Sequence, residues 1–450
     1  MAVTNDMSAD RRVARHVAAL REAGHDVVIV HRAPQNGSPL STLRSPLSTL
    51  HSPLSALHSP LSTPHSPLSA PRSPLSTLHS PLSTLHSPLP ALHSPLSTLH
   101  SPLPTLHSPL STLHSSGWHF YLEFNIALWR RLLELKPDVV WANDTDTLLG
   151  CWLAARRLRS KLVMDAHELF PEVPEIQHKP LVKWFWRTIE RMLMPRCNAL
   201  LTVCQSIADY YKEKYGVDMA VVRNISSLNS LSPNPSPAGE GSRYPECEHS
   251  TPLSPGRGAG GEDIGAVLLY QGCVNLGRGV DWAIDALEYL PQCRLVVAGR
   301  GDLLEQMKAY AASKPWADRV EFLGHVPPDE LPALTCKADV GLVMLEDMGL
   351  SYHYALPNRI GDFVAAGVPM VVNDLPEMAA VVRRFGVGEV IEIESSKLKI
   401  EKECSRALAK AVERVLSRTW SDEDFAEARK DMDWNKEKQK LIDICYTTFC

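Results

Sequence analysis

Short apolar runs alternate with segments of helical character along most of the chain, and this alternation restricts the possible folds more than any other feature. An apolar run, a helix and a second apolar run form the pattern of βαβ units, which build parallel sheets. Two series of such units predict an α/β protein with two Rossmann-like domains. The default ligand site of such a protein is the cleft between the domains. The predicted strands lie at residues 27–30, 137–141, 161–165, 199–203, 266–270, 293–299, 320–324, 338–343 and 370–372.

Two segments of low complexity interrupt the alternation. Residues 38–114 repeat the unit Ser-Pro-Leu-Ser-Thr-Leu-His eleven times with small variations. A proline in every copy forbids a continuous helix, so we expect a disordered insertion whose removal leaves the fold intact. Residues 226–264 are rich in Ser, Pro and Gly and are expected to be a linker. We therefore predict an N-terminal domain of residues 1–37 and 115–225, and a C-terminal domain of residues 265–450 that ends in helices.

The repeated segment also contains nine histidines. Capture of a metal ion by these histidines is open, but duplication of a stretch of coding sequence explains the near identity of the copies better. The ten cysteines of the chain lie singly, without a C-x-x-C pair. We therefore expect reduced thiols in the cytoplasm, and neither a metal site nor a disulfide scaffold.

Overall charge and hydropathy exclude other classes of protein. The net charge of −5 gives no overall basic footprint, so we expect no nucleic-acid partner. No apolar run reaches the length of about 18 residues that a membrane-spanning helix needs. The N-terminus lacks the charged and then apolar pattern of a secretory signal. These features predict a cytoplasmic protein.

The segment of residues 354–374 has the most informative local pattern. Pro357 suits the first turn of a helix, and Gly367 suits its end. The free N–H groups at such a start, near Pro357 and Asn358, would receive an anion, most naturally a phosphate. Asp362 lies one turn further and could accept hydrogen bonds from vicinal hydroxyl groups, such as those of a ribose. Phosphate and sugar together predict a nucleotide site.

Loops after the predicted strands of the second half supply further candidate contacts for this nucleotide. Arg278 precedes a helix start at Gly279 and is suited to clamp a diphosphate. Glycines let a backbone approach a ligand closely, although the pair at 299 and 301 is equally consistent with a structural turn. Backbone amides of the segment 323–331 would read a base edge. The expected contacts in these loops are Gly272, Gly299, Gly301, His325 and Val326.

A histidine in the first half is a candidate polar catalytic group. His167 follows a predicted buried strand, between Asp165 and Glu168. A histidine at the carboxyl end of a parallel strand would face the cleft. We place Asp165 and Glu168 on the acceptor side of the site. A structural histidine in a solvated acidic loop is the alternative.

The order and spacing of these motifs resemble the retaining glycosyltransferases of the GT-B fold, the "glycosyl transferases group 1" or family 4 class. The resemblance implies that the C-terminal domain holds a nucleotide-diphosphate sugar donor and the N-terminal domain a glycan or lipid-linked acceptor. The similar segments are Asp10-Arg-Arg-Val13, Ala23-Gly-His-Asp-Val27, Pro137-Asp-Val-Val140, Asp165-Ala-His-Glu-Leu-Phe170, Tyr270-Gln-Gly272 with Arg278-Gly279, Val320-Glu-Phe-Leu-Gly324, Ala338-Asp339, and Leu356-Pro-Asn-Arg-Ile-Gly-Asp362 with Ala366-Gly-Val-Pro369.

The resemblance also implies roles for three residues. Asp362 matches the second acidic position of the family's E-x7-E motif, which is the usual ribose contact. Arg278 matches the basic residue that binds the donor phosphates, and His167 matches the cleft histidine near the transferred sugar. Retention is thought to proceed by front-face attack, in which the leaving diphosphate takes the acceptor proton. On this basis neither a cofactor nor a metal ion is required.

The sequence departs from the family pattern at several positions. Tyr354, rather than Glu, stands eight residues before Asp362, and Glu346 in the preceding loop is a candidate replacement. Cys273 stands where many members have a second basic residue, five positions before Arg278. The first strand, which we place near residues 2–4, is expected to be cut short.

Three functions are compatible with these features. The leading hypothesis is a sugar transferase of envelope or capsular polysaccharide assembly. The alternatives are a UDP-sugar 2-epimerase of the same fold and a non-catalytic nucleotide-sugar binder. Residues 183–194 mix basic and large apolar side chains, as in an interfacial helix on anionic lipid at the inner face of the plasma membrane. A helix packed within the N-terminal domain is the alternative for this segment.

Overall fold

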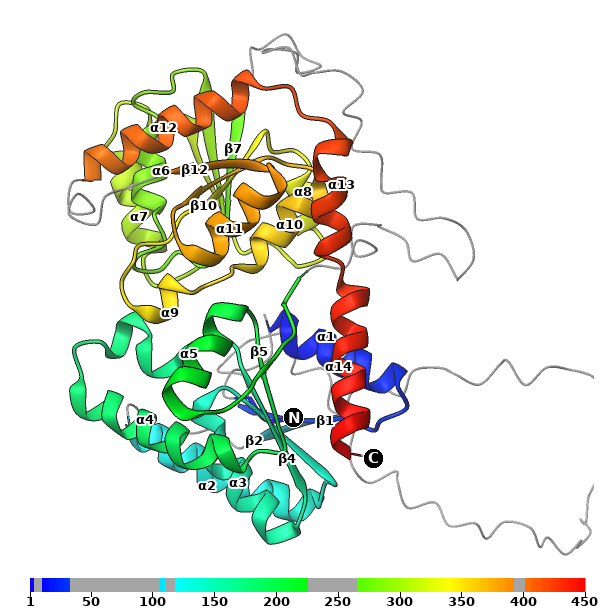
Figure 1. Cartoon of the computed structure of the whole chain (residues 1–450). Coiled ribbons are helices and arrows are strands. Elements are labelled where there is room, and N and C mark those ends of the chain that lie inside the picture. The colour runs from blue at the N-terminus through cyan, green and yellow to red at the C-terminus, as the bar shows by residue number, and fades with distance from the viewer. Residues whose placement is uncertain (4–9, 33–105, 111–117, 226–264, 392–400, 450) are drawn as a thin grey trace, which may run out of the picture. The chain divides into compact units, whose positions relative to one another are not determined.

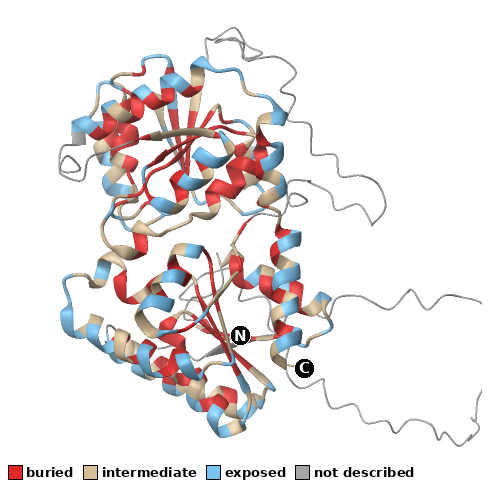
Figure 2. Cartoon of the chain, viewed as in Figure 1, coloured by how far each residue is buried: buried red, intermediate tan, exposed pale blue. Residues whose placement is uncertain are grey.

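The computed structural model describes residues 1–3, 10–32, 106–110, 118–225, 265–391 and 401–449. These residues form two sheets in which all paired strands are parallel, as the alternation of strands and helices predicts (Figure 1). Buried residues concentrate on the strands and on the helix faces turned toward them (Figure 2). In this part of the chain, no helix combines the length and the apolar character needed to cross a membrane.

The first sheet contains a four-stranded part, in the order β3-β4-β5-β6, and the pair β1-β2. Ala2 joins the two parts, because it bridges both Val30 of β1 and Ala142 of β3. Ala2, which we expect to belong to a short first strand, therefore lies between β1 and β3 and pairs with each through an isolated bridge. The strands are β1 (Val28–Arg32), β2 (Leu106–Leu110), β3 (Val139–Asn143), β4 (Lys161–Ala166), β5 (Ala199–Thr202) and β6 (Ala220–Val221).

The strand β2 lies inside the segment for which we expected disorder. It pairs with β1 in parallel register, from Val28 opposite Leu106 to Arg32 opposite Leu110. An edge strand tolerates proline, and an extended segment of the repeat can satisfy the otherwise unpaired backbone groups of β1. The expectation of disorder is therefore wrong for residues 106–110. The remaining residues of 38–114, and the whole of 226–264, lie outside the described residues.

Helices cover both faces of the first sheet. Alternate residues of β3 face opposite ways: Val140 packs in the core with α2 to α5, whereas Trp141 packs with Val13 of α1 and Leu441 of α14. We had assigned the last helix to the C-terminal domain, but it packs on the first sheet. The helices are α1 (Arg11–Glu22), α2 (Trp118–Leu135), α3 (Thr145–Leu158), α4 (Pro180–Leu193), α5 (Gln205–Tyr215) and α14 (Trp434–Phe449).

The second sheet has six strands in the order β12-β11-β10-β7-β8-β9. The first strand of this sheet, β7, lies in its middle. The strands β8 and β9 extend the sheet to one side and β10, β11 and β12 to the other, so a switch point lies between β7 and β10. Ligands of such sheets bind outside the carboxyl ends of the strands at this point. The strands are β7 (Ala266–Gln271), β8 (Cys293–Ala298), β9 (Val320–Gly324), β10 (Val340–Val343), β11 (Met370–Asn373) and β12 (Gly388–Ile391).

Helices also cover both faces of this sheet. Leu268 packs in one core with α6 and α12, and Leu269 packs in another with α10, α11 and α13. Gly341 of β10 lies under Phe363 of α10, where a Cβ atom would be 2.7 Å from the ring. This close approach seats α10 on the strands. The helices are α6 (Val280–Ala286), α7 (Leu304–Ala312), α8 (Leu331–Thr335), α9 (Leu350–His353), α10 (Asn358–Ala366), α11 (Pro376–Phe385), α12 (Glu401–Ser417) and α13 (Asp422–Asp431).

Candidate functional site

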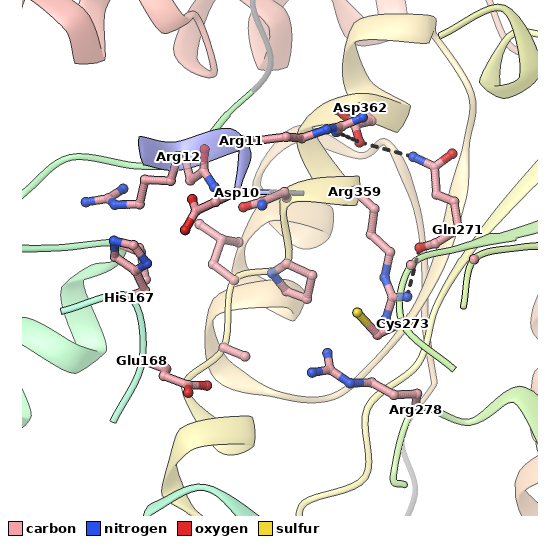
Figure 3. A pocket seen from close by; sticks show the side chains of 18 of the residues that line it. Asp10, Arg11, Arg12, His167, Glu168, Gln271, Cys273, Arg278, Arg359 and Asp362 are labelled. Carbon is pink, nitrogen blue, oxygen red and sulfur yellow. Dashed lines mark hydrogen bonds and ion pairs between the residues drawn. The ribbon is translucent and has the colours of Figure 1, made fainter. Parts of the chain in front are cut away.

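A cavity of about 740 Å³ lies at the carboxyl ends of strands from both sheets (Figure 3). It brings together most of the residues that the sequence singled out. Two of them, Asp165 and Gly301, do not line it. The predicted residues that do are His167, Glu168, Gly272, Arg278, Gly299, His325, Val326, Pro357, Asn358 and Asp362.

The N-terminus of α10 opens into this cavity. The helix begins at Asn358, so Pro357 occupies the N-cap position rather than the first turn that we predict for it. No side chain accepts a hydrogen bond from the N–H groups at this helix start. Pro357 and Asn358 both line the cavity, and the first N–H groups of a helix have no acceptor within the helix. Gly367 ends the helix in the left-handed conformation, with φ of 70°. The helix start that we predict to bind an anion thus has no side-chain cap and lies at the wall of the cavity.

Asp362 lies one turn into α10 and is held by two donors. Nη1 of Arg11 and Nε2 of Gln271 each lie 3.1 Å from its Oδ2 (Figure 3). The Gln271 amide is oriented in turn by the Thr335 hydroxyl, which donates to its Oε1 at 2.9 Å. The carboxylate is 12% exposed and lines the cavity. It is therefore fixed in position and within reach of a bound hydroxyl group.

Arg278 lies in the loop before α6. Its guanidinium stacks over the Tyr352 ring at 4.6 Å from the ring centroid, and its buried Nε has no hydrogen-bond partner. Glu168 points toward Arg278 from the first sheet (Figure 3). Burial, together with the charge of Asp144, raises the pKa of Glu168 to about 7 in spite of Arg278. The cavity thus has a cation on the second sheet and a readily protonated carboxyl group on the first.

His167 lies between two carboxylates. Its Nδ1 is 3.3 Å from Oδ2 of Asp144, and its Nε2 is 3.3 Å from Oδ2 of Asp165. Burial alone would lower its pKa, but the charges of Asp144 and Asp165 raise it to about 9. The two carboxylates therefore favour the protonated form of His167. Asp144 has a positive φ of 61°, and its Oδ1 accepts a hydrogen bond from the His167 backbone N–H at 2.7 Å. Such backbone strain is typical of functional sites.

Asp165 is fully buried, which corrects its assignment to the acceptor side. Its carboxylate receives two hydrogen bonds from Arg12, at 2.9 and 2.5 Å, and it also faces His16 at 3.3 Å. Burial opposes its ionisation, yet Arg12 and His167 hold its pKa well below the usual range. Asp165 is therefore a positioning residue that fixes Arg12 and His167 beside the cavity. Because Asp165 does not line the cavity, we assign it no direct contact with a ligand.

Packing explains why residues 299 and 301, which follow β8, are glycines. A Cβ atom at Gly299 would lie 1.7 Å from the carbonyl oxygen of Gly272, and one at Gly301 would lie 2.2 Å from Asn275 Oδ1. The turns after β7 and β8 thus touch each other at these points. This contact favours the structural explanation for Gly301, whereas Gly299 also reaches the cavity.

The cavity contains further polar residues to which we assign no role from the sequence alone. Arg11, Arg12 and Arg359 stand at helix starts, and Gln271 and Arg300 stand where β7 and β8 end. These are the positions at which a parallel α/β fold gathers ligand contacts, so a systematic search of them would have found the residues. The additional polar residues are Asp10, Arg11, Arg12, Asn224, Gln271, Arg300, Ser351, Tyr352 and Arg359.

Comparison with protein families identifies the class. A "Glycosyl transferase 4-like domain" matches residues 9–226, and "Glycosyl transferases group 1" matches residues 265–418. The first half of the chain thus resembles the glycosyl transferase 4-like domain, and the second half resembles the group 1 glycosyl transferases. An uncharacterized glycosyltransferase of Methanocaldococcus jannaschii is 25% identical over 199 residues, which are 42% of this chain and 46% of that protein. The match thus spans less than half the length of this curated relative.

Solved structures of low sequence identity share the fold of this chain. Sucrose-phosphate synthase from Thermosynechococcus elongatus has a TM-score of 0.66 at 13% identity, with 100% of this chain and 98% of that chain covered. HepE of Anabaena, in complex with UDP and glucose, has a TM-score of 0.60 at 13% identity, with 99% and 98% covered. WaaG, a glycosyltransferase involved in lipopolysaccharide biosynthesis, has a TM-score of 0.58 at 12% identity, with 98% of each chain covered. The predicted GT-B fold is confirmed.

The structure also places the positions at which this chain departs from the family pattern. Tyr354 packs against the hydrophobic core of the first sheet, and its carbonyl oxygen accepts a hydrogen bond from Sγ of Cys204 at 3.2 Å. Neither Tyr354 nor Glu346 lines the cavity, whereas Cys273 does. The carboxylates that do reach the cavity are Asp10, Glu168 and Asp362.

Proposed function

We propose that the protein is a retaining glycosyltransferase that moves a sugar from a nucleotide-diphosphate donor to a glycan or lipid-linked acceptor in envelope polysaccharide assembly. The observation that carries the proposal is the open N-terminus of α10, which shares one cavity with Asp362 and Arg278. A helix start and a guanidinium are suited to a diphosphate, and a fixed carboxylate to the ribose hydroxyls. The complex of HepE with UDP and glucose supports a UDP-sugar as the first donor to test.

The proposed mechanism relies on charge and positioning. Arg278 and the start of α10 stabilise the leaving diphosphate, which takes the acceptor proton during front-face attack. A protonated His167 cannot act as a base, so in this mechanism it acts through its positive charge near the transferred sugar. Glu168 is assigned to the acceptor side of the site. We further propose that the diphosphate charge is met by these groups without a metal ion.

Contact with a membrane belongs to the same proposal. The helix α4 buries Trp186, Ile189 and Leu193 but exposes apolar side chains on its other face. Such a face, with cations nearby, is suited to the surface of an anionic bilayer, where a lipid-linked acceptor would reside. We therefore propose a cytoplasmic protein that contacts the inner face of the plasma membrane through α4. The exposed apolar residues are Leu181, Trp184, Phe185 and Met192.

The test is the release of nucleoside diphosphate from a panel of UDP-, GDP- and ADP-sugars, with and without a lipid extract as acceptor, and with and without EDTA. Release that depends on the acceptor, with retained anomeric configuration in the product, supports the proposal. A rearranged free sugar without acceptor would instead identify an epimerase. Binding without turnover would identify a non-catalytic binder, an alternative favoured by the packing of Tyr354 away from the cavity. Loss of turnover in EDTA would contradict the metal-free mechanism.

A further inference from the structure

Arg359 is a buried arginine in the first turn of α10, directly after Asn358. It is 6% exposed, yet it lines the cavity. Its Nη1 donates to the carbonyl oxygen of Gln271 at 3.1 Å, and its Nη2 donates to that of Met344 at 3.3 Å. The guanidinium also stacks over the Tyr270 ring, 4.8 Å from the centroid. The side chain is therefore fixed at the ends of β7 and β10.

The charge of Arg359 lacks a carboxylate partner among the described residues. This distinguishes it from two other arginines of the cavity, since Arg11 pairs with Asp362 and Arg12 pairs with Asp165. Carbonyl oxygens and an aromatic ring compensate a buried cation only in part, and an unpaired buried charge is costly. The buried Nε of Arg359 also has no hydrogen-bond partner. An anion bound in the cavity would therefore compensate a buried positive charge that the protein itself leaves without a carboxylate partner.

The position of Arg359 indicates which anion. Its Nη1 would be 3.0 Å from a Cβ atom at Gly272, so the guanidinium lies against the turn that follows β7. Figure 3 shows Cys273 of this turn beside Arg359, with Arg278 on the further side of the turn. Two guanidinium groups and the start of α10 therefore surround one part of the cavity. Planar guanidinium groups match the paired oxygens of phosphates, and two of them match the charge of a diphosphate.

We infer that Arg359 binds the diphosphate of the donor, together with Arg278 and the N-terminus of α10. The inference deepens the proposed function and rests on it. In this arrangement Arg359 supplies the second cation of the diphosphate site, beside the neutral Cys273. Asp362 contacts the sugar end of the nucleotide from the next turn of the same helix. The first two turns of α10 thus carry both the phosphate and the ribose contacts.

The experiment compares the wild type with Arg359→Gln by calorimetric titration of the full-length protein with UDP, GDP, ADP, the matching nucleosides and inorganic pyrophosphate. We expect Arg359→Gln to bind the preferred nucleoside diphosphate about 10 to 100 times more weakly, the effect of one charge-assisted hydrogen-bonding group. Affinity for the phosphate-free nucleoside should stay the same. Arg414→Gln is the matched control, because Arg414 is an exposed arginine that pairs with Glu389 at 2.8 Å outside the cavity.

The outcomes separate this inference from the proposed function. Unchanged diphosphate affinity in Arg359→Gln, or an equal loss for nucleoside and diphosphate, overturns the inference while the proposed function stands. Pyrophosphate binding that depends on Arg359, without any nucleotide binding, supports the anion site and contradicts the proposed function. If Arg359→Gln does not fold, Arg359→Lys decides, because lysine keeps the charge but not the forked geometry. A smaller rise in Tm on addition of the diphosphate supports the inference, and a rise equal to that of the wild type overturns it.

Discussion

Asp362 is the residue on which the proposed ribose contact depends most directly. We expect Asp362→Ala to weaken the binding of a nucleoside diphosphate about tenfold or more, because a carboxylate that accepts from two hydroxyl groups is lost. The fold should remain, since the core face of α10 is formed by Ile360, Phe363 and Val364. Calorimetric titration measures the affinity, and circular dichroism checks the fold. Unchanged affinity would refute this placement of the ribose.

A control for this variant is available on the same sheet. Asp374 follows β11 and pairs with Arg383 at 2.8 Å, on a partly exposed surface outside the cavity. We expect Asp374→Ala to bind the nucleotide as the wild type does. A similar loss in both variants would indicate a general effect of removing negative charge rather than loss of a ribose contact.

The buried carboxyl group of Glu190 is predicted to make the stability of the protein depend on pH. It is fully buried and accepts hydrogen bonds from Thr145, Tyr211 and Tyr215 at 2.9, 2.9 and 3.0 Å. Burial outweighs these donors and raises its pKa to about 7. The folded protein therefore holds this proton more tightly than the unfolded chain does, and the contribution of Glu190 to stability falls as the pH rises from about 4.5 to about 7.

The neutral variant Glu190→Gln lacks this dependence on pH. Relative to the wild type, its free energy of unfolding should rise by up to about 3 kcal/mol between pH 5 and pH 8. Urea denaturation at the two pH values measures the difference. Glu213→Gln, at an exposed position of α5, should show no such change. A difference between Glu190→Gln and the wild type that is constant with pH would contradict the assignment.

The element with the clearest unexplained surface is α4. Its exposed apolar residues recur at helical spacing and share one face, opposite the residues that pack on the core. Lys183 and Arg187 are engaged by Glu172, so they supply less free positive charge than the sequence suggested. Attraction to anionic lipid would come from the exposed cations Lys179, Arg191 and Arg196. The apolar face is therefore the decisive part of the proposed membrane contact.

Replacement of that face provides the element-scale prediction. The double variant Leu181→Ser with Trp184→Ser should bind vesicles of anionic phospholipid at least about tenfold more weakly, because two large apolar side chains no longer enter the bilayer. Co-sedimentation with vesicles measures the binding. The control Tyr446→Ser alters an exposed aromatic residue of α14 and should bind as the wild type does. Equal binding by all three proteins would exclude α4 as the contact.

At the scale of the whole molecule, residues 1–35 and 105–450 form one compact unit. Replacement of residues 38–104 by a short Gly/Ser linker should therefore leave Tm unchanged within about 2 °C, since a surface loop adds little to the free energy of chain closure. A deletion extended through residue 114 should lower Tm, because it removes β2 from the edge of β1. Thermal denaturation of both variants tests this. A large fall in Tm for the shorter deletion would show that the repeat packs against the remaining chain.

Local patterns in the sequence account for much of the fold. The apolar runs and the helix signals predicted parallel sheets because side-chain burial follows the period of each element. They missed the short strand β6 and the edge strand β12 as well as β2. Of these, β2 consists of a repeat whose sequence has no apolar alternation, and only its pairing with β1 makes it extended. The placement of α14 on the first sheet was missed for a related reason. An amphipathic helix shows that it has a partner but not which partner.

The candidate site divides in the same way. The sequence by itself determined the open start of α10 and the positions of Pro357, Asn358 and Asp362, because capping and helix spacing are local properties. Only the tertiary structure decided which charges are compensated. Arg11 meets Asp362 from 351 residues away, whereas the buried Arg359 meets no carboxylate among the described residues. Ion pairing depends on distance in space, and that distance exists only once both sheets have formed.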